Sequence, residues 1–237
     1  HVTLNMESAE GREIFKSLVG GADVLIETYP AGTMDGWGLG YEELEKLNPR
    51  LIMCSITGYG QFGPDSGRKL YDYDNVSQAR SGIQYCTGEV LPEGKTVKDM
   101  PWAVPTKAGP HIAWAVSGTF GAMGILAALY HRGKTGEGQA IDICTPEAYS
   151  RLADYQLMWY AHAGVIAERF GSLDTALWLY GFFPTKDGGV FLGGLRLEMW
   201  KAFVDIIGKY DEWKAEEWTT LAPFMKKDWQ LKYQSMI

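Results

Sequence analysis

Cysteine is scarce in this sequence. The 237 residues include only Cys54, Cys86 and Cys144, which lie far apart and form no CxxC pair. This spacing excludes a disulfide framework and a zinc ribbon. Free thiols are typical of a reducing compartment, so we expect the protein to be cytoplasmic.

Positive charge is also in deficit. The chain carries 22 Lys and Arg against 29 Asp and Glu, a net charge of −7. Non-specific binding to nucleic acid needs a cationic surface that displaces the counterions of the phosphates. We therefore expect no nucleic-acid partner, and any phosphate ligand would have to be held by a few local cations.

Common catalytic and nucleotide-binding motifs are missing. The sequence has no GxxxxGK[ST], GxSxG or HExxH, and no GxGxxG that leads directly from a predicted strand into a helix. Gly133 to Gly136 reads GKTG, but it follows a predicted helix and precedes a predicted strand, the reverse of a phosphate loop. His111, His131 and His162 are scattered, so we expect no metal centre.

The composition is that of a globular protein with a substantial core. Hydrophobic residues make up 46% of the chain and charged residues 22%. This balance excludes disorder as the main state. The sequence begins at His1 with neither an initiator methionine nor a signal peptide, so we expect it to be an internal piece of a longer protein.

Helices and strands alternate in the first part of the chain. Ser8 followed by apolar residues at helical spacing predicts a helix over residues 8–19. Two apolar runs, residues 23–28 and 51–57, predict strands, and residues 41–46 between them predict a helix. The strands lack polar alternation, so we expect them to be buried on both faces of a parallel sheet, with ligands beyond their carboxyl ends.

No charged residue occurs from Ile112 to Tyr130, a length that approaches a membrane span. We favour a core helix over a membrane helix. Pro110 suits a helix start, and Gly118, Gly121 and Gly124 form a small-residue face for close packing. We accordingly expect no membrane partner.

The second half of the chain predicts a smaller domain. Residues 131–139 predict a polar loop and residues 140–144 a strand, with Thr145 capping the next helix. Residues 186–189 (KDGG) predict a hairpin turn, and residues 198–207 have helical spacing. We expect an α/β domain with a doubly wound parallel sheet over residues 1–176 and the start of a small α+β domain over residues 177–237.

Cations, phenols and carboxylates are concentrated in residues 68–78, where a loop enters a predicted helix. Asp72 or Asp74 at such a position predicts a helix cap among ordinary exposed charges. A ligand site is the alternative.

The order of these motifs resembles that of the class III CoA-transferases, the CaiB/BaiF family. The segments that carry the resemblance, in chain order, are residues 8–15 (SAEGREIF), 22–27 (ADVLIE), 38–42 (GLGYE), 47–52 (LNPRLI), 55–64 (SITGYGQFGP), 73–78 (YDNVSQ), 87–88 (TG), 124–129 (GILAAL), 135–139 (TGEGQ) and 180–188 (YGFFPTKDG). Each segment is weak alone, but their collinear spacing is specific.

The resemblance implies a covalent mechanism that this chain cannot complete. In the family, an Asp near the start of the glycine-lined helix attacks the acyl-CoA thioester and forms an anhydride and then an aspartyl thioester. Trp114 occupies that position here, and an indole offers only an N–H donor. In the racemase relatives the catalytic His and acid would fall at Tyr73 and Trp114, so proton abstraction is not expected either.

Other family positions also differ. The usual Asn-Phe after the first strand reads Thr28-Tyr29, and an Arg often found downstream reads Gly36. The resemblance still implies a surface for coenzyme A, with Asp74 at a family acidic position and as a candidate catalytic residue. Its expected contacts are Thr28, Tyr29, Trp37, Lys69, Tyr71 and Tyr73.

The resemblance thus implies transfer of CoA between an acyl-CoA and a carboxylic acid, with no permanently bound cofactor. Because Trp114 replaces the nucleophile, we expect the subunit without the Asp, whose sister subunit supplies it. The alternative of a conventional enzyme, with its active carboxylate elsewhere in the chain, remains open. So does an inactive CoA-binding or scaffold protein. The family typically forms interlocked dimers, so either a homodimer or a heteromer is expected.

Overall fold

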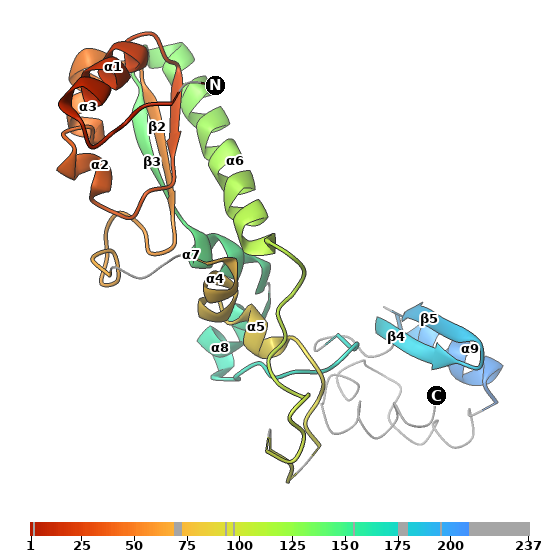
Figure 1. Cartoon of the computed structure of the whole chain (residues 1–237). Helices are drawn as coiled ribbons and strands as arrows, with labels where there is room; N and C mark the ends of the chain where they lie inside the picture. Colours follow the sequence, from red (N-terminus) through yellow and green to blue (C-terminus); the bar gives the residue numbers. More distant parts are fainter. Residues whose placement is uncertain are drawn as a thin grey trace. The chain divides into compact units, whose positions relative to one another are not determined.

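The computed structural model describes residues 1, 3–68, 73–92, 94–96, 98–153, 155–174, 180–194 and 196–208 (Figure 1). The chain divides into two compact units. The first consists of residues 1–84 and 107–164, and the second of residues 85–106 and 165–237. The boundary between residues 176 and 177 stays a prediction, and each unit is described by itself below.

The first unit is a parallel α/β layer. Its elements in chain order are α1 (Ala9–Val19), β1 (Val24–Glu27), α2 (Thr33–Gly36), α3 (Tyr41–Leu47), β2 (Ile52–Thr57), α4 (Asp74–Arg80), α6 (Ile112–Thr135), β3 (Gln139–Cys144), α7 (Thr145–Ser150), a 3₁₀ turn (Arg151–Ala153) and α8 (Tyr155–Ala163). The short helix α5 (Ile83–Cys86) spans the boundary between the units in the chain.

The three strands are parallel in the order β1-β2-β3, with helices on both faces. Figure 1 shows α1 and α3 on one side of the sheet and α6 on the other. The predicted doubly wound α/β fold is confirmed. Burial on both faces is right for β2, whose residues are almost all buried, but wrong for β1, where Ile26 is exposed.

Local sequence explains the start of the layer. The Ser8 hydroxyl accepts a hydrogen bond from the Gly11 backbone N–H at 3.0 Å and caps α1, as predicted. A core on this side of the sheet joins α1, α2, α3, β2 and the segments before α3 and β2 through Val19, Met34, Leu39, Leu44, Leu51 and Met53. These contacts hold the loop after β1 in place above the sheet.

Helix α6 packs on the other face through glycine. A Cβ at Gly121 would lie 3.1 Å from Ile56, and one at Gly124 would lie 3.2 Å from Ile141. Both positions therefore let the helix approach the strands closely. Gly118 does not serve this purpose, because no neighbouring atom lies within 4 Å of its Cβ position.

The helix runs further than predicted. It ends at Thr135, so the polar loop expected from residue 131 is wrong for its first five positions. Arg132 explains the extension, since its buried guanidinium donates to the Asp23 carboxylate at 2.8 Å and to the Arg50 carbonyl at 2.9 Å. Gly136 then takes a left-handed conformation, φ 84°, and ends the helix.

By length and composition α6 is able to span a membrane. In the structure its buried side consists of Ala113, Ser117, Gly121, Ala128 and Arg132, whereas Met123, Leu126 and Tyr130 are exposed. The buried side supports a packed helix, and the absence of a membrane partner stays a prediction.

The second unit contains the hairpin of β4 (Tyr180–Thr185) and β5 (Gly188–Gly193) and the helix α9 (Leu197–Ile206). The predicted hairpin is present, but Thr185 pairs with Gly188, so the turn is only Lys186 and Asp187, and the other two residues of the predicted turn begin β5. The helix expected over residues 198–207 is confirmed within one residue at each end.

Candidate active site at the carboxyl ends of the strands

A pocket of about 620 Å³ lies in the first unit, beyond the carboxyl ends of β1 and β2. Most of the described residues that line it belong to the loop after β1, the loop after β2 and the first turns of α6. Thr28, Tyr29 and Trp114 all line this pocket. The structure therefore brings together three of the predicted site residues from distant parts of the chain.

Trp37 supports the site without lining the pocket. Its ring meets that of Tyr29 edge to face, with centroids 5.0 Å apart and an interplanar angle of 78°. Trp37 also packs on the core beneath α1 and α3. It therefore fixes the Tyr29 ring, and direct contact of Trp37 with a ligand stays a prediction.

Trp114 stands in the first turn of α6 with 42% of its surface exposed. Its indole is stacked on the His111 imidazole, with centroids 5.0 Å apart and planes 11° apart. His111 has φ 55° and ψ 28°, the only non-glycine residue with positive φ in the described part of the chain. A side chain in this left-handed conformation is costly, and such residues are concentrated at functional sites.

Asp74 caps the start of α6 and not that of its own helix. Its Oδ1 accepts hydrogen bonds from the backbone N–H groups of Ala113 at 2.8 Å and Trp114 at 3.2 Å. The local helix α4 has no side-chain cap, so the cap predicted at this position belongs to another helix. Asp74 is 4% exposed, and its catalytic role stays a prediction.

The second oxygen of Asp74 is occupied as well. Oδ2 accepts a hydrogen bond from the Gln78 side-chain amide at 2.7 Å and lies 3.6 Å from the Lys107 ammonium. Gln78 is fully buried and also pairs with the backbone of Ala108, accepting at 2.9 Å and donating at 3.0 Å. This closed network ties α4 to the segment that leads into α6.

The loop after β2 is held by an ionic cluster. The Asp65 carboxylate pairs with Arg80 and, at 2.7 Å, with Arg68. The hydrogen bond from Arg80 lowers the pKa of Asp65, and the Arg80 guanidinium lies 4.7 Å from the centre of the Tyr59 ring. Tyr59 and Arg68 line the pocket, so this cluster shapes its wall.

Two buried hydroxyls were missed by sequence reasoning. Thr57 ends β2, Thr145 follows β3, and both line the pocket. Neither hydroxyl has a hydrogen-bond partner among the described residues. The prediction that Thr145 caps α7 is wrong, because the N-cap is Cys144 and no side chain caps that helix.

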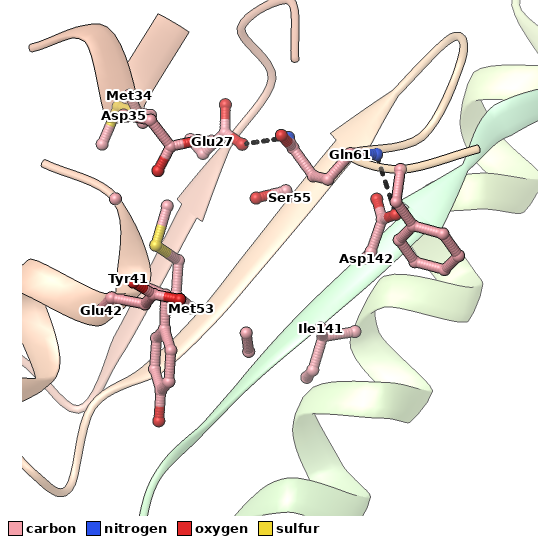
Figure 2. A pocket seen from close by; sticks show the side chains of 13 residues that line it. Glu27, Met34, Asp35, Tyr41, Glu42, Met53, Ser55, Gln61, Ile141 and Asp142 are labelled. Atoms are coloured by element: carbon pink, nitrogen blue, oxygen red, sulfur yellow. Dashed lines mark hydrogen bonds between the residues drawn. The ribbon is translucent and has the colours of Figure 1, made fainter. Parts of the chain in front are cut away.

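A second pocket, of about 510 Å³, lies between the strands and the elements α2 and α3 (Figure 2). Gln61 bridges two acids there: its amide donates to Glu27 at 3.2 Å and its backbone N–H donates to Asp142 at 2.8 Å. Burial raises the pKa of Asp142. The bridge holds the glycine loop after β2, and the only sequence signal for it was a single acid within each of the strands β1 and β3.

Three further predicted contacts, Lys69, Tyr71 and Tyr73, are not among the lining residues that the structure describes. Lys69 and Tyr71 lie outside the described residues. Tyr73, just before α4, is exposed and is not among the described residues of the pocket. Contacts of these three side chains with CoA stay predictions.

The pocket lacks a carboxylate in its described part. The lining residues that the structure describes include no Asp or Glu. The nearby thiol of Cys144 is no substitute, because burial raises its pKa to about 11 and keeps it protonated at neutral pH. The described pocket can bind a ligand, but it contains no strong nucleophile.

Comparison with known proteins gives a consistent result. A family model described as "CoA-transferase family III" matches residues 1–230. The beta subunit of succinyl-CoA–L-malate CoA-transferase from Chloroflexus aurantiacus is 39% identical over 188 residues, covering 79% of this chain and 44% of that protein. The alpha subunit of the enzyme of that name from the same species is 38% identical over 187 residues, covering 79% and 41%.

The fold has solved counterparts. The crystal structure of a CAIB/BAIF family protein from Brucella suis matches with a TM-score of 0.70 and 29% identity, covering 99% of this chain and 63% of that one. The chain spans less than half the length of the two curated relatives named above.

Proposed function

The chain belongs to CoA-transferase family III, and we propose that the protein takes part in moving CoA from an acyl-CoA to a carboxylic acid as the subunit that lacks the nucleophilic Asp. The observation that carries this proposal is Trp114 in the pocket. The resemblance of the motifs aligns Trp114 with the family's nucleophile, and none of the described lining residues is acidic.

The transfer of CoA by this family requires a carboxylate nucleophile. Only a carboxylate can form both the acyl anhydride and the CoA thioester reversibly at one side chain. The indole of Trp114 has no lone pair available for attack. Asp74 is close, but both of its oxygens are engaged with the start of α6, with Gln78 and with Lys107. Its carboxylate therefore holds the start of α6.

A sister subunit with an Asp at the corresponding position would supply the missing group. Similarity to both the alpha and the beta subunit of a named two-subunit transferase supports such an arrangement. In this proposal the present chain binds CoA thioesters through Thr28 and Tyr29, and it needs no permanent cofactor. We place the complex in the cytoplasm, away from membranes.

Purification of the full-length protein alone and with Asp-containing family members from its own organism tests the proposal. CoA transfer should be measured with succinyl-CoA as donor and several carboxylic acids as acceptors. Hydroxylamine trapping followed by mass spectrometry should then label an Asp of the sister chain and no acid of this one.

Two results would contradict the proposed function. Transfer by a pure homodimer, with a hydroxamate on one of its own acids, would show a conventional enzyme with its carboxylate elsewhere. CoA binding by the pure protein without transfer in any combination would favour the alternative function, an inactive CoA-binding or scaffold protein.

A further inference from the structure

We propose that Trp114, held in place by His111, forms a wall that selects planar, uncharged acyl groups on the bound thioester. This inference rests on the proposed function, because it names the acyl class that the same pocket would take. It assigns a specificity role to the residue that replaces the nucleophile.

The rings of His111 and Trp114 are arranged so that part of the indole stays open to the pocket. His111 and Trp114 are stacked almost in parallel, and the indole is nevertheless 42% exposed and lines the pocket. The imidazole therefore supports one part of the indole and leaves another part open. Planar groups stack on such a surface, whereas saturated rings and branched chains of equal size do so less well.

The backbone at His111 has a left-handed conformation. Its left-handed conformation starts α6 and allows its ring to lie on the residue three positions later. Glycine would adopt this conformation without strain. A histidine at this position bears the conformational cost, and the feature that it adds over glycine is the stacked ring.

The described lining of the pocket carries little charge. Arg68 is the single cationic residue among the described lining residues, and its Nε lies 2.7 Å from Asp65. Around Trp114, the described lining consists of uncharged residues such as Ile56, Ser117 and Gly118. A second carboxylate on the acyl group would meet no unpaired cation among the described lining residues, only neutral groups such as the hydroxyls of Thr57 and Thr145, which is costly in a partly desolvated site.

The test compares matched thioesters by isothermal titration calorimetry on the full-length protein, in complex with its sister subunit if the two co-purify. Benzoyl-CoA and cyclohexanecarbonyl-CoA have the same number of acyl carbons but differ in planarity. Succinyl-CoA provides a charged acyl group, and free CoA measures the contribution of the carrier. We expect benzoyl-CoA to bind about 10-fold more tightly than cyclohexanecarbonyl-CoA.

Variants assign the effect to the ring pair. Trp114→Leu should remove the preference for the planar thioester. Trp114→Phe should reduce the ratio of the two affinities from about 10-fold to about 3-fold. His111→Gly retains the backbone conformation and removes only the stacked ring, so it should reduce the preference about 3-fold. Trp102→Leu, at a 69% exposed residue of the second unit, is the matched control and should change nothing.

The outcomes separate this inference from the proposed function. Equal affinities for the planar and saturated thioesters, with tight binding of CoA itself, would overturn the inference alone. Equal loss of affinity for every CoA compound in Trp114→Leu would also overturn it, because the indole would then contact the carrier. Failure of the unmodified protein to bind any CoA compound would overturn both.

Discussion

The carboxylate of Asp74 accepts a hydrogen bond from the backbone N–H of Trp114, at 3.2 Å, across 40 positions of the chain. The residue predicted to be catalytic therefore caps the helix turn that carries Trp114. Anions at a helix N-terminus are favourable because the free N–H groups and the helix dipole point toward them. Asp74 thus sets the position of residue 114 in the pocket.

Loss of this cap should destabilise the first unit. Asp74→Ala leaves buried donors of the α6 backbone and of Gln78 without a partner, so we expect a loss of about 2–4 kcal/mol in the free energy of unfolding. Asp74→Asn keeps an acceptor oxygen and should cost about 1 kcal/mol. Urea unfolding followed by circular dichroism measures both values.

Glu10→Ala is the control for this series, because Glu10 is an exposed carboxylate in the first turn of α1. It should change the free energy of unfolding by less than about 0.5 kcal/mol. If Asp74→Ala proved as mild as Glu10→Ala, the cap would not hold the helix as the hydrogen bonds indicate.

Two glycines of α6 provide a matched pair for helix packing. Gly121→Ala places a methyl group 3.1 Å from Ile56 and 3.5 Å from the Cys54 sulfur, and should destabilise by about 1–3 kcal/mol. Gly118→Ala meets no neighbouring atom within 4 Å and should stabilise the helix by about 0.5–1 kcal/mol. Thermal and urea unfolding of the two variants should therefore shift in opposite directions.

Shifts of the same sign would contradict the packing geometry. A stabilised Gly121→Ala in particular would mean that α6 does not approach β2 closely. The Gly118→Ala result also serves as an internal measure of helix propensity, against which the steric cost at Gly121 is read.

Asp142 makes the stability depend on pH. Burial raises the pKa of this carboxyl group in the folded state, so the folded chain binds a proton more readily than the unfolded chain. The contribution of Asp142 to stability is then fully present below its unfolded pKa, about 3.9, and is lost as the pH rises through the raised value. Asp142→Asn should remove this loss while keeping an acceptor for the Gln61 N–H.

The measurement is urea unfolding of both proteins at several pH values from 4 to 7. The stability of the unmodified protein, taken relative to Asp142→Asn, should fall as the pH rises. A relative stability that increases with pH would show that the hydrogen bond from Gln61 outweighs desolvation and lowers this pKa instead.

The sequence predicts those features that depend on neighbouring residues. The Ser8 cap, the parallel strands and the hairpin at Lys186 and Asp187 follow from local patterns and were confirmed. Asp74 also has the pattern of a cap, but its partners lie 39 and 40 residues further along, so only the fold reveals which helix it serves.

The same distinction applies to the site. The resemblance assigned Thr28 and Tyr29 to a CoA surface and Trp114 to the nucleophile position, and the structure brings all three into one pocket. The bridge from Glu27 through Gln61 to Asp142 was missed, since it depends on the path of the loop after β2. The stack of His111 on Trp114 was missed as well, because the left-handed backbone that allows it has no sequence signal beyond glycine.

Replacement of Trp114 by Asp should supply the missing nucleophile. The side chain would project from the first turn of α6 into the pocket, where the helix dipole favours an anion. We expect Trp114→Asp to form a hydroxylamine-trappable acyl adduct at residue 114 when the full-length protein is incubated with an acyl-CoA, whereas the unmodified protein forms none. Mass spectrometry of the tryptic peptide locates the adduct.

Trp114→Asn is the matched control, because its amide has nearly the same shape as the acid but is not a nucleophile for the thioester. An adduct at residue 114 in Trp114→Asp alone would show that the pocket places the thioester beside the first turn of α6. No adduct in Trp114→Asp, combined with normal binding of acyl-CoA, would mean that the thioester lies elsewhere. The proposal that Trp114 occupies the nucleophile position would then be wrong.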